Sequence, residues 1–449
     1  MNNKKLVVIG GDAAGMTAAS KVRREQPERE IVVFERGSHT SYAACGMPYY
    51  IGGQVDSEES LIARKPEVFR EKQNIDVRIR HEVIEIDIEK KRVKVKNLDQ
   101  EKEFRETWDD LLIATGASPI VPKMENIDAG GVFALSTLQS GIDVFNFIEK
   151  KKPSKAVIVG GGYIGIEMAE AFLDRSMEVI LIDMAPQLMT TLDKDMADLI
   201  LEYMTEQQVK VFLEEKLVKF EKKDDGSVKS VITDKQSIAA DIVILGMGVK
   251  PNSELAAKAG IKLGSGDAIK VNKRLETSAP NVWAAGDCAE SFHLAAQKQV
   301  HIALGTVASK QGLVAGTNIS GGNAEFPGVL GTAITKFKDL EISRTGLSEK
   351  EAKELGVDYL AEKITSTNPA GYYPGTEKIN VKLLVDKQSG RILGGQIVGF
   401  NGAAKRIDTI ATANTARMTA QQLIDLDLAY APPFSTVWDP VQIVARKFV

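Results

Sequence analysis

The stretches "KKLVVIGGDAAGMTAASKVRR" (residues 4–24) and "SKAVIVGGGYIGIEMAEAF" (residues 154–172) share one pattern. Each begins with an apolar run typical of a buried strand, passes through a glycine turn, and continues as a helix rich in small residues. An acidic residue closes the next apolar run: Glu35 lies 25 residues after the first glycine of its turn, and Asp183 lies 23 residues after the first glycine of its own. Because such a carboxylate suits ribose hydroxyls while the helix start suits a pyrophosphate, the sequence predicts two dinucleotide-binding units.

The two glycine turns are not identical. The second is regular, with Gly160, Gly162 and Gly165, whereas the first has Asp12 where the middle glycine belongs. A carboxylate at that position has to point away from the phosphates. Since the whole strand, turn and helix context recurs, we expect both copies to bind dinucleotides; the alternative is an ordinary connection between a strand and a helix.

The composition limits the function classes. A chain of 449 residues accommodates roughly three domains. Its net charge of -4, with 26% charged residues, argues against a protein that coats nucleic acid or an anionic membrane, so anionic ligands must meet local basic clusters. No apolar run approaches the ~18 residues of a membrane span. Two cysteines cannot form a disulfide framework, and the start "MNNKKLVVIGG" has too short an apolar run for a signal peptide, so we expect a cytoplasmic protein.

Further strand and turn motifs follow the two units. They are "WDDLLIATGASP" (108–119), "ADIVILGMGVKPN" (240–252) and "NVWAAGDCAE" (281–290). After Gly321 the pattern changes to alternating strand-like runs with one helical stretch, which indicates a separate α+β domain beginning near "NISGGNAEFPG". The predicted fold is therefore α/β, with two Rossmann-like domains and a C-terminal α+β domain.

The order of these motifs resembles the flavin-dependent pyridine nucleotide-disulfide reductases over the whole chain. The resemblance implies a glutathione reductase-like fold in which the first turn holds FAD, the second holds NAD(P)H, and the C-terminal domain forms a homodimer. It divides the chain into an FAD-binding domain in two parts (1–115 and 248–322), an NAD(P)H-binding domain (116–247) and a dimerisation domain (323–449).

The same resemblance implies a set of cofactor contacts. Asp287 is expected at a ribityl hydroxyl, Tyr163 over the flavin and Glu167 near the nicotinamide, although Tyr163 could instead serve helix packing. "MAPQ" follows Asp183 without an adjacent Arg or Lys, so NADH is expected to be preferred over NADPH. The residues expected to bind the cofactors are Gly10, Gly11, Ala14, Gly15, Glu35, Arg36, Thr115, Gly116, Gly286, Asp287, Leu304, Gly305, Thr306, Gly160, Gly162, Tyr163, Ile164, Gly165, Glu167, Asp183 and Gly248.

Cys45 is the candidate redox residue. It lies in "HTSYAACGMPYYIGG" (39–53), a loop that follows the strand ending in Glu35 and should emerge at the ligand-binding edge of the sheet. The larger reductases of the family carry a Cys-x4-Cys pair, but the fifth residue after Cys45 is Tyr50. An intrachain pair at that spacing is therefore excluded, and Cys288 is expected to be a buried structural residue.

A single reactive cysteine leaves two oxidised states open: a sulfenic acid or a mixed disulfide with a small thiol. The resemblance separates them. Single-cysteine NADH oxidases and peroxidases carry a histidine at the position of Ala13, and two-cysteine reductases take a histidine base from the partner's C-terminal region, whereas this chain has no histidine after His301. It has tyrosines there instead, in "NPAGYYPG" (368–375) and "DLAYAPPF" (427–434).

This combination is similar to the coenzyme A-disulfide reductases, which pair one cysteine with two tyrosines of the partner subunit. By that resemblance the catalytic residues are Cys45, Tyr430 and Tyr372, with Tyr373 the less favoured neighbour. The basic side chains expected to bind the ADP portion of coenzyme A lie at the end of the first helix and in a later loop. The alternative is that these side chains are only solvated, since basic residues at the end of a helix are also favoured by the helix dipole. The residues expected to contact coenzyme A are Lys21, Arg24, Ser41, Arg64 and Lys65.

The expected reaction is NAD(P)H-driven, FAD-dependent reduction of coenzyme A disulfide through a Cys45–S–S–CoA mixed disulfide, with Tyr430 as acid and no metal. We expect the flavin and a nearby helix start to favour the Cys45 thiolate. An NADH-dependent polysulfide or persulfide reductase, or an NADH oxidase, is the alternative on the same scaffold. No nucleic-acid or membrane partner is expected.

Overall fold

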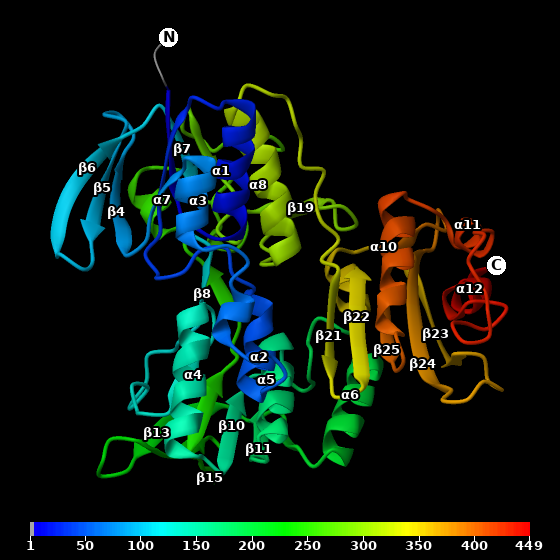
Figure 1. Cartoon of the computed structure of the whole chain (residues 1–449). Coiled ribbons are helices and arrows are strands. Elements are labelled where there is room, and N and C mark those ends of the chain that lie inside the picture. The colour runs from blue at the N-terminus through cyan, green and yellow to red at the C-terminus, as the bar shows by residue number, and fades with distance from the viewer. Residues whose placement is uncertain (1–3) are drawn as a thin grey trace.

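The computed structural model describes residues 4–449; residues 1–3, the start of the segment expected to open the FAD-binding domain, lie outside the described residues. The first sheet has five parallel strands in the order β18-β7-β1-β2-β3, flanked by α1, α3 and α8 (Figure 1). Its strand interiors are apolar because helices and loops cover both faces. The elements are β1 (Lys5–Ile9), α1 (Ala13–Glu25), β2 (Glu30–Phe34), α3 (Pro66–Gln73), β3 (Asp76–Arg78), β7 (Asp110–Ile113), β18 (Val282–Ala284) and α8 (Gly305–Ile319).

The second sheet repeats this plan, with parallel strands in the order β12-β11-β10-β16-β9. Even the strand starts correspond: Lys5 pairs in register with Glu30, and Lys155 pairs with Glu178. The elements are β9 (Val132–Ala134), α4 (Leu138–Lys151), β10 (Lys155–Val159), α5 (Tyr163–Asp174), β11 (Glu178–Ile182), α6 (Lys194–Glu206), β12 (Lys210–Phe212) and β16 (Ile242–Leu245).

Smaller elements surround the two sheets. Two antiparallel three-stranded sheets flank them, and the β8·β17 pair lies where the chain enters and leaves the second sheet. The elements are β4 (His81–Asp87), β5 (Arg92–Asn97) and β6 (Lys102–Thr107); β13 (Leu217–Lys222), β14 (Val228–Thr233) and β15 (Ser237–Ala239); β8 (Ala117–Pro119) and β17 (Val249–Pro251); β19 (Ser291–His293) and β20 (Lys298–Val300); and the helices α2 (Met47–Gly52) and α7 (Glu254–Lys258).

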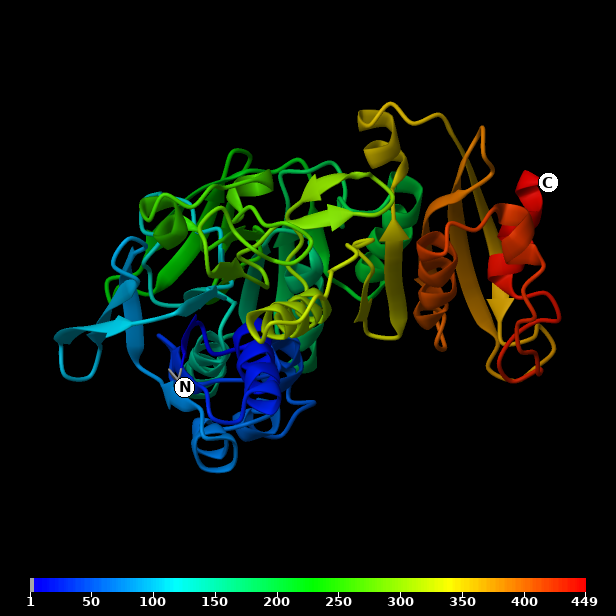
Figure 2. The same ribbon diagram turned by 90° about the horizontal axis from the view of Figure 1, so that it is seen from above.

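The C-terminal part is a five-stranded antiparallel sheet in the order β21-β22-β25-β24-β23, with α10 and α12 packed on it. It stands beside the two Rossmann-like units and contacts α5 and α6 of the second one (Figure 2). The elements are β21 (Ala333–Phe337), β22 (Leu340–Gly346), α9 (Glu349–Glu354), β23 (Tyr359–Asn368), β24 (Glu377–Asp386), β25 (Ile392–Gly399), α10 (Ile407–Thr415), α11 (Ala420–Ile424) and α12 (Pro440–Ala445). The predicted fold class is confirmed.

Helices α1 and α8 cross at unusually short range, side by side in Figure 1. A Cβ placed on Gly312 would lie 2.4 Å from the carbonyl oxygen of Ala14, and one on Gly316 would lie 2.8 Å from that of Ala18. Only glycine fits these contacts, so the pair of glycines holds the middle of α8 against the start of α1, next to the first glycine turn. Among residues 4–449, none of the helices has the length and apolar character needed to cross a membrane.

Candidate active site

Both glycine turns lie at topological switch points. From β1 the chain runs to β2 and β3 on one side and to β7 and β18 on the other, and β10 holds the same place in its own sheet. In open α/β sheets, ligands bind at the carboxyl end of the strands at such a point. The structure therefore places the two predicted turns where dinucleotides bind in this architecture.

The turns themselves leave room only for backbone. Gly10 and Gly160 have φ of +107° and +109°, a region that favours glycine. A Cβ on Gly15 would lie 2.0 Å from the carbonyl oxygen of Gly10, and a Cβ on Gly165 would lie 1.9 Å from that of Gly160. Within the described chain, no side chain caps the start of α1 or α5, and neither helix has an acidic residue in its first turn. Their N–H groups therefore suit a pyrophosphate.

The two acidic residues at the strand ends are held in matching ways. The carboxylate of Glu35 accepts hydrogen bonds from the backbone N–H groups of Gly11 (2.7 Å) and Gly37 (2.6 Å). That of Asp183 accepts from Gly161 (2.6 Å) and Ala185 (2.8 Å). Each carboxylate thus faces its own glycine turn, beside the position expected for the ribose of a bound dinucleotide.

Several other predicted cofactor residues gather around the first turn. A Cβ on Gly286, whose φ is +82°, would lie 2.9 Å from the Cβ of Ala14, and Leu304 is the N-cap residue of α8. Gly305 and Thr306 follow it at the exposed start of that helix. Arg36 is exposed, and its guanidinium lies 3.7 Å from the Glu82 carboxylate rather than over the turn.

Asp287 follows β18 and is half-buried. Burial raises the pKa of its carboxyl, while the charge of His301 acts in the opposite direction. A ring nitrogen of His301 lies 2.7 Å from the backbone oxygen of Asp287, a contact that the sequence did not indicate. The neighbouring Cys288 is fully buried, with its sulfur 3.4 Å from the Ala285 carbonyl oxygen, as a structural cysteine would be.

Thr115, Gly116 and Gly248 lie at the crossing between the sheets. The hydroxyl of Thr115 donates to the carbonyl oxygen of Asn252 (2.6 Å), and the Asn252 amide donates back to the carbonyl oxygen of Thr115 (2.8 Å). Ile164 packs on the core of the second unit. The pair of Thr115 and Asn252 holds together the two chain segments that lead into and out of the second unit, and the sequence did not single out Asn252.

Cys45 lies on a single 3-10 turn, Ala44–Gly46, directly before α2. The N–H of Ala43 donates to the carbonyl oxygen of Leu61 (2.7 Å), which fixes the loop, and the thiol is exposed in the isolated chain. Partial desolvation raises the pKa of Cys45, and the carboxylates of Glu167 and Asp287 raise it further. The protein's own charges therefore favour the thiol, which is opposite to the contribution that we expected from the short helix α2.

Glu167 lies on α5 of the second unit, where its charge acts on Cys45 and its side chain contacts the C-terminal sheet. The hydroxyl of Thr335 donates to its carboxylate at 2.8 Å, and burial raises the pKa of Glu167. One turn further along α5, Glu170 accepts from the Gln54 amide (3.2 Å) and from the backbone N–H of Lys338 (2.9 Å). The end of α2, one face of α5 and β21 therefore meet beside the cysteine loop.

The predicted tyrosines lie far from Cys45 of the same chain. The segments that carry them, between β23 and β24 and between α11 and α12, lie on the far side of the C-terminal sheet from α2 in both views (Figures 1 and 2). The two segments are joined by a hydrogen bond from the N–H of Ala370 to the carbonyl oxygen of Pro432 (3.0 Å). Tyr372 is 76% exposed, and contact with the Tyr430 hydroxyl raises its pKa. Tyr373 is also exposed.

The predicted coenzyme A residues are only partly brought together. The carbonyl oxygen of Ser41 accepts from the N–H groups of Ala63 (2.9 Å) and Arg64 (3.3 Å), so Ser41 and Arg64 are neighbours. Lys65 follows as the N-cap residue of α3. On α1, Arg24 is exposed, but Lys21 is engaged in an ion pair with Glu25 at 2.5 Å.

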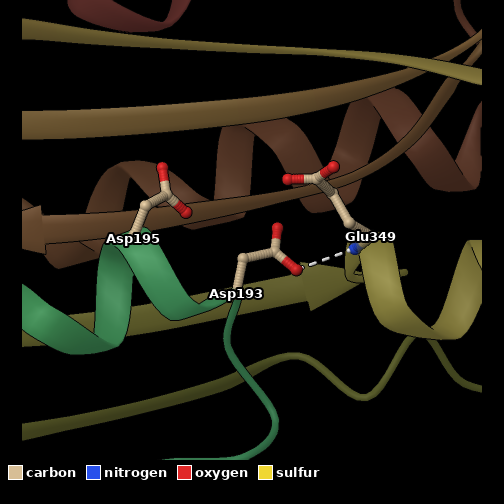
Figure 3. A group of neighbouring side chains, drawn as sticks. All are labelled: Asp193, Asp195 and Glu349. Carbon is tan, nitrogen blue, oxygen red and sulfur yellow. Dashed lines mark hydrogen bonds between the residues drawn. The ribbon is translucent and has the colours of Figure 1, made fainter. Parts of the chain in front are cut away.

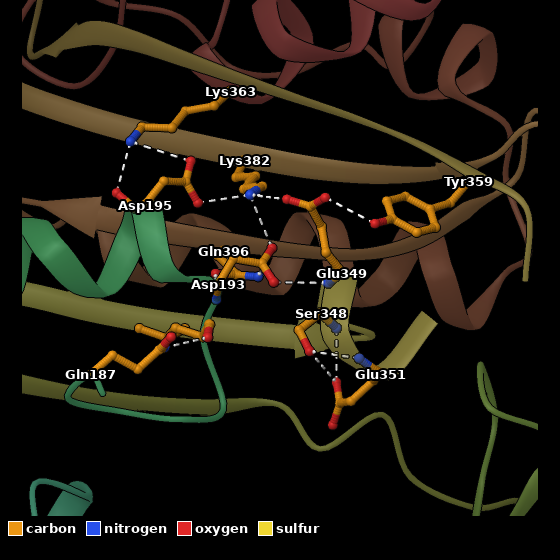
Figure 4. A network of polar contacts seen from close by, with 11 residues as sticks. Gln187, Asp193, Asp195, Ser348, Glu349, Glu351, Tyr359, Lys363, Lys382 and Gln396 are labelled. Atoms are coloured by element: carbon orange, nitrogen blue, oxygen red, sulfur yellow. Dashed lines mark hydrogen bonds and ion pairs between the residues drawn. The ribbon is translucent and has the colours of Figure 1, made fainter. Parts of the chain in front are cut away.

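One acidic cluster lies between the second unit and the C-terminal sheet. The carboxylates of Asp193, Asp195 and Glu349 point toward one another (Figure 3), in a geometry that could hold a metal. However, the buried Lys382 ammonium lies among them, at 3.2, 2.7 and 2.5 Å respectively (Figure 4). Lys363 pairs with Asp195 as well, at 3.4 Å. The two lysines supply the positive charge of this cluster, which therefore functions as an ionic link between domains.

Comparison with known proteins identifies the family. The family model described as "Pyridine nucleotide-disulphide oxidoreductase" matches residues 4–312, and the corresponding dimerisation domain matches residues 332–440. The chain belongs to this pyridine nucleotide-disulphide oxidoreductase family.

Individual relatives of this oxidoreductase differ in their named activities. It is 43% identical to the NAD(P)H sulfur oxidoreductase (CoA-dependent) of Pyrococcus furiosus, over 99% of each chain. It is 31% identical to the coenzyme A disulfide reductase of Staphylococcus haemolyticus, also over 99% of each chain. The structure of reduced Bacillus anthracis CoADR-RHD matches with a TM-score of 0.96 and 37% identity, covering 100% of this chain and 80% of that one. The predicted likeness to coenzyme A-disulfide reductases is thus confirmed at the level of the family and of named relatives.

Proposed function

We propose that this oxidoreductase uses FAD and NAD(P)H to reduce sulfur–sulfur bonds through a mixed disulfide between Cys45 and coenzyme A. The observation that carries the proposal is the position of Cys45: an exposed thiol beside the first glycine turn that also feels the charge of Glu167 in the second unit. The other cysteine, Cys288, is fully buried. A single accessible thiol needs a small-molecule thiol as its disulfide partner.

The chain fits both cofactors. The backbone-only cradle at Gly10 and Gly15 with Glu35 suits FAD, and the same construction at Gly160 and Gly165 with Asp183 suits NAD(P)H. When bound, FAD supplies electron transfer between the nicotinamide and sulfur. NADH is favoured over NADPH because the Asp183 carboxylate repels a 2′-phosphate.

In the proposed reaction, the Cys45 thiolate attacks one sulfur of coenzyme A disulfide. The substrate's S–S bond breaks, the Cys45–S–S–CoA bond forms, and one coenzyme A leaves as a thiolate that must gain a proton. Two electrons then cleave the mixed disulfide and release the second coenzyme A. Because the isolated chain favours the thiol form of Cys45, the residues around it must also accept the thiol proton before attack.

The tyrosines are proposed to act across a homodimer. Tyr430, assisted by Tyr372 or Tyr373, would donate a hydrogen bond or a proton to the leaving sulfur. Their exposure and their distance from Cys45 of the same chain support a role in the partner's site. Arg24, Ser41, Arg64 and Lys65 are the proposed coenzyme A contacts; Lys21 contributes less while it pairs with Glu25.

A second candidate is the reduction of polysulfide or persulfide with coenzyme A as the carrier. The 43% identity to a CoA-dependent sulfur oxidoreductase favours it. Both candidates use the same mixed disulfide, and they differ in the sulfur species that reacts with it. NADH consumption measured side by side with coenzyme A disulfide, polysulfide and oxygen separates them, because the true acceptor will give the highest kcat/KM.

The experiment that tests the proposal combines mass spectrometry and turnover. Non-reduced protein should carry an adduct of the mass of coenzyme A on Cys45. The Cys45→Ser variant should keep bound FAD and lose reduction of both sulfur acceptors, whereas the control Cys288→Ala variant should retain it. Full activity of Cys45→Ser would refute the mixed-disulfide proposal.

A further inference from the structure

Asp12, the residue in place of the middle glycine, has an ordinary extended backbone, with φ of -113° and ψ of -153°. Its counterpart Gly162 has φ of -83° and ψ of -167°, and no described atom lies within 4 Å of a Cβ built there. A side chain at this position is therefore free of strain. The presence of a carboxylate, rather than of any side chain, is what needs an explanation.

The Asp12 side chain reaches the cysteine loop. Its carboxylate accepts a hydrogen bond from the backbone N–H of Tyr42 at 3.3 Å. The N–H of Ser41 donates to the carbonyl oxygen of Gly11 at 3.2 Å. Two successive residues of the loop are thus attached to the phosphate-binding turn, and Tyr42 is three residues before Cys45.

Negative groups face Asp12 from several elements. Glu35 lies at the end of β2 and Asp287 follows β18, while the titratable side chains of Tyr42 and Cys45 lie on the loop. The cationic form of His301, beside Asp287, is the nearby group of opposite sign. Burial, with smaller contributions from Glu35 and Asp287, raises the pKa of Asp12 to about 6 although the N–H groups of Tyr42 and Ala13 oppose the shift.

We infer that Asp12 is a positioning residue that ties the cysteine loop to the phosphate-binding turn and couples the binding of FAD to the uptake of one proton. The inference rests on the proposed binding of FAD at the first turn. A pyrophosphate would add negative charge to a place that already holds three carboxyl groups, so the complex forms most readily when Asp12 takes up a proton from water. The protonated carboxyl still accepts the Tyr42 hydrogen bond through its carbonyl oxygen, so the tie is kept.

The proton coupling is tested by titrating FAD into the full chain from which FAD has been removed. For the natural protein, the Kd for FAD should rise by up to about tenfold per pH unit above about pH 6, as expected for the uptake of one proton. Asp12→Asn keeps the acceptor but carries no charge, so its Kd should be lower at pH 8 and independent of pH in this range. A parallel pH dependence in both proteins would overturn the coupling.

The positioning role is tested by amide hydrogen exchange over residues 41–46, compared among the natural protein, Asp12→Asn and Asp12→Gly. Asp12→Gly restores the regular glycine pattern but removes the acceptor. We expect Asp12→Asn to retain protection and Asp12→Gly to exchange about two- to tenfold faster, the effect of one lost hydrogen bond. Equal protection in all three proteins would overturn the tie. Failure of every variant to bind FAD at any pH would instead overturn the proposed function, and the inference with it.

Discussion

At the scale of single residues, the surroundings of Cys45 favour its protonated thiol form. After desolvation, Glu167 is the strongest influence that raises the pKa of the thiol, and Glu167 is itself a partly buried carboxyl with a raised pKa. The hydroxyl of Thr335 stabilises the charged form of Glu167 through a 2.8 Å hydrogen bond. The negative charge of the Glu167 carboxylate therefore disfavours the Cys45 thiolate.

The Glu167→Gln substitution should lower the pKa of Cys45, because it removes a negative charge that opposes the thiolate. The measurement is the rate of Cys45 alkylation by iodoacetamide as a function of pH, and the profile should move to lower pH. Glu25→Gln, an exposed change on α1 away from the cysteine loop, is the control and should leave the profile in place. A shift to higher pH would contradict the electrostatic account.

At the scale of elements, the crossing of α1 and α8 determines how tightly the first turn is enclosed. Gly312→Ala adds a Cβ that would lie 2.4 Å from the Ala14 carbonyl oxygen, so the helices must separate. We expect the free energy of unfolding to fall by about 1–3 kcal/mol, as in other overpacked sites. Urea denaturation measures it.

Gly305→Ala makes the same chemical change at the exposed start of the same helix, where no described atom lies within 4 Å of the added Cβ. It serves as the control for stability and should cause no loss. Equal destabilisation by the two substitutions would show that helix propensity, and not the crossing, is responsible.

The elements that could be predicted from the sequence are those defined by local patterns. Each glycine turn, its following helix and the acidic strand end lie within about 30 residues, the length of one βαβ unit. The contact between Glu167 and Thr335 joins residues 168 positions apart, and the one between Asp193 and Gln396 joins residues 203 positions apart. Such contacts leave no periodic trace in one sequence, and so Thr335, Glu170 and Lys382 were not foreseen.

At the scale of the whole molecule, the ionic cluster around Lys382 joins the second unit to the C-terminal sheet. Burial lowers the pKa of Lys382, but hydrogen bonds to Asp195 and Glu349 outweigh this and raise it above its ordinary value of 10.5. Lys382 in turn holds the pKa values of Asp195 and Glu349 below their ordinary values of 3.8 and 4.5, despite burial. The stabilisation is therefore complete between about pH 4.5 and 10.5, and it is lost in acid as the carboxylates take up protons and in base as Lys382 loses its own.

Lys382→Met should lower the free energy of unfolding by about 3 kcal/mol at pH 7, because it leaves three neighbouring carboxylates without their shared cation. The loss should shrink toward pH 4, where the carboxylates of the variant become protonated. Denaturation at the two pH values measures both effects. Lys387→Met, at an exposed ion pair 3.6 Å from Asp358, should change stability by less than about 0.5 kcal/mol. A loss that does not depend on pH would point to packing instead of charge.

The exposed apolar side chains near the tyrosines fit the dimerisation domain that the family model identifies. Phe434 and Val437 are 74% and 70% exposed in the isolated chain. Val437→Glu places a charge among them and should shift the protein from dimer to monomer in analytical ultracentrifugation while FAD stays bound. The proposed function then requires that disulfide reduction falls with the dimer fraction; a fully active monomer would exclude a contribution from the partner.

The separation between Cys45 and the tyrosine segments of its own chain has a genetic consequence. If each catalytic pocket takes its sulfur from one subunit and its phenols from the other, two inactive mutants can complement one another. Co-expression of Cys45→Ser with a Tyr372→Phe, Tyr430→Phe chain would form hybrids in which one pocket carries every lesion and the other carries none. Random pairing would then restore about one quarter of the natural rate, although neither parent is active alone.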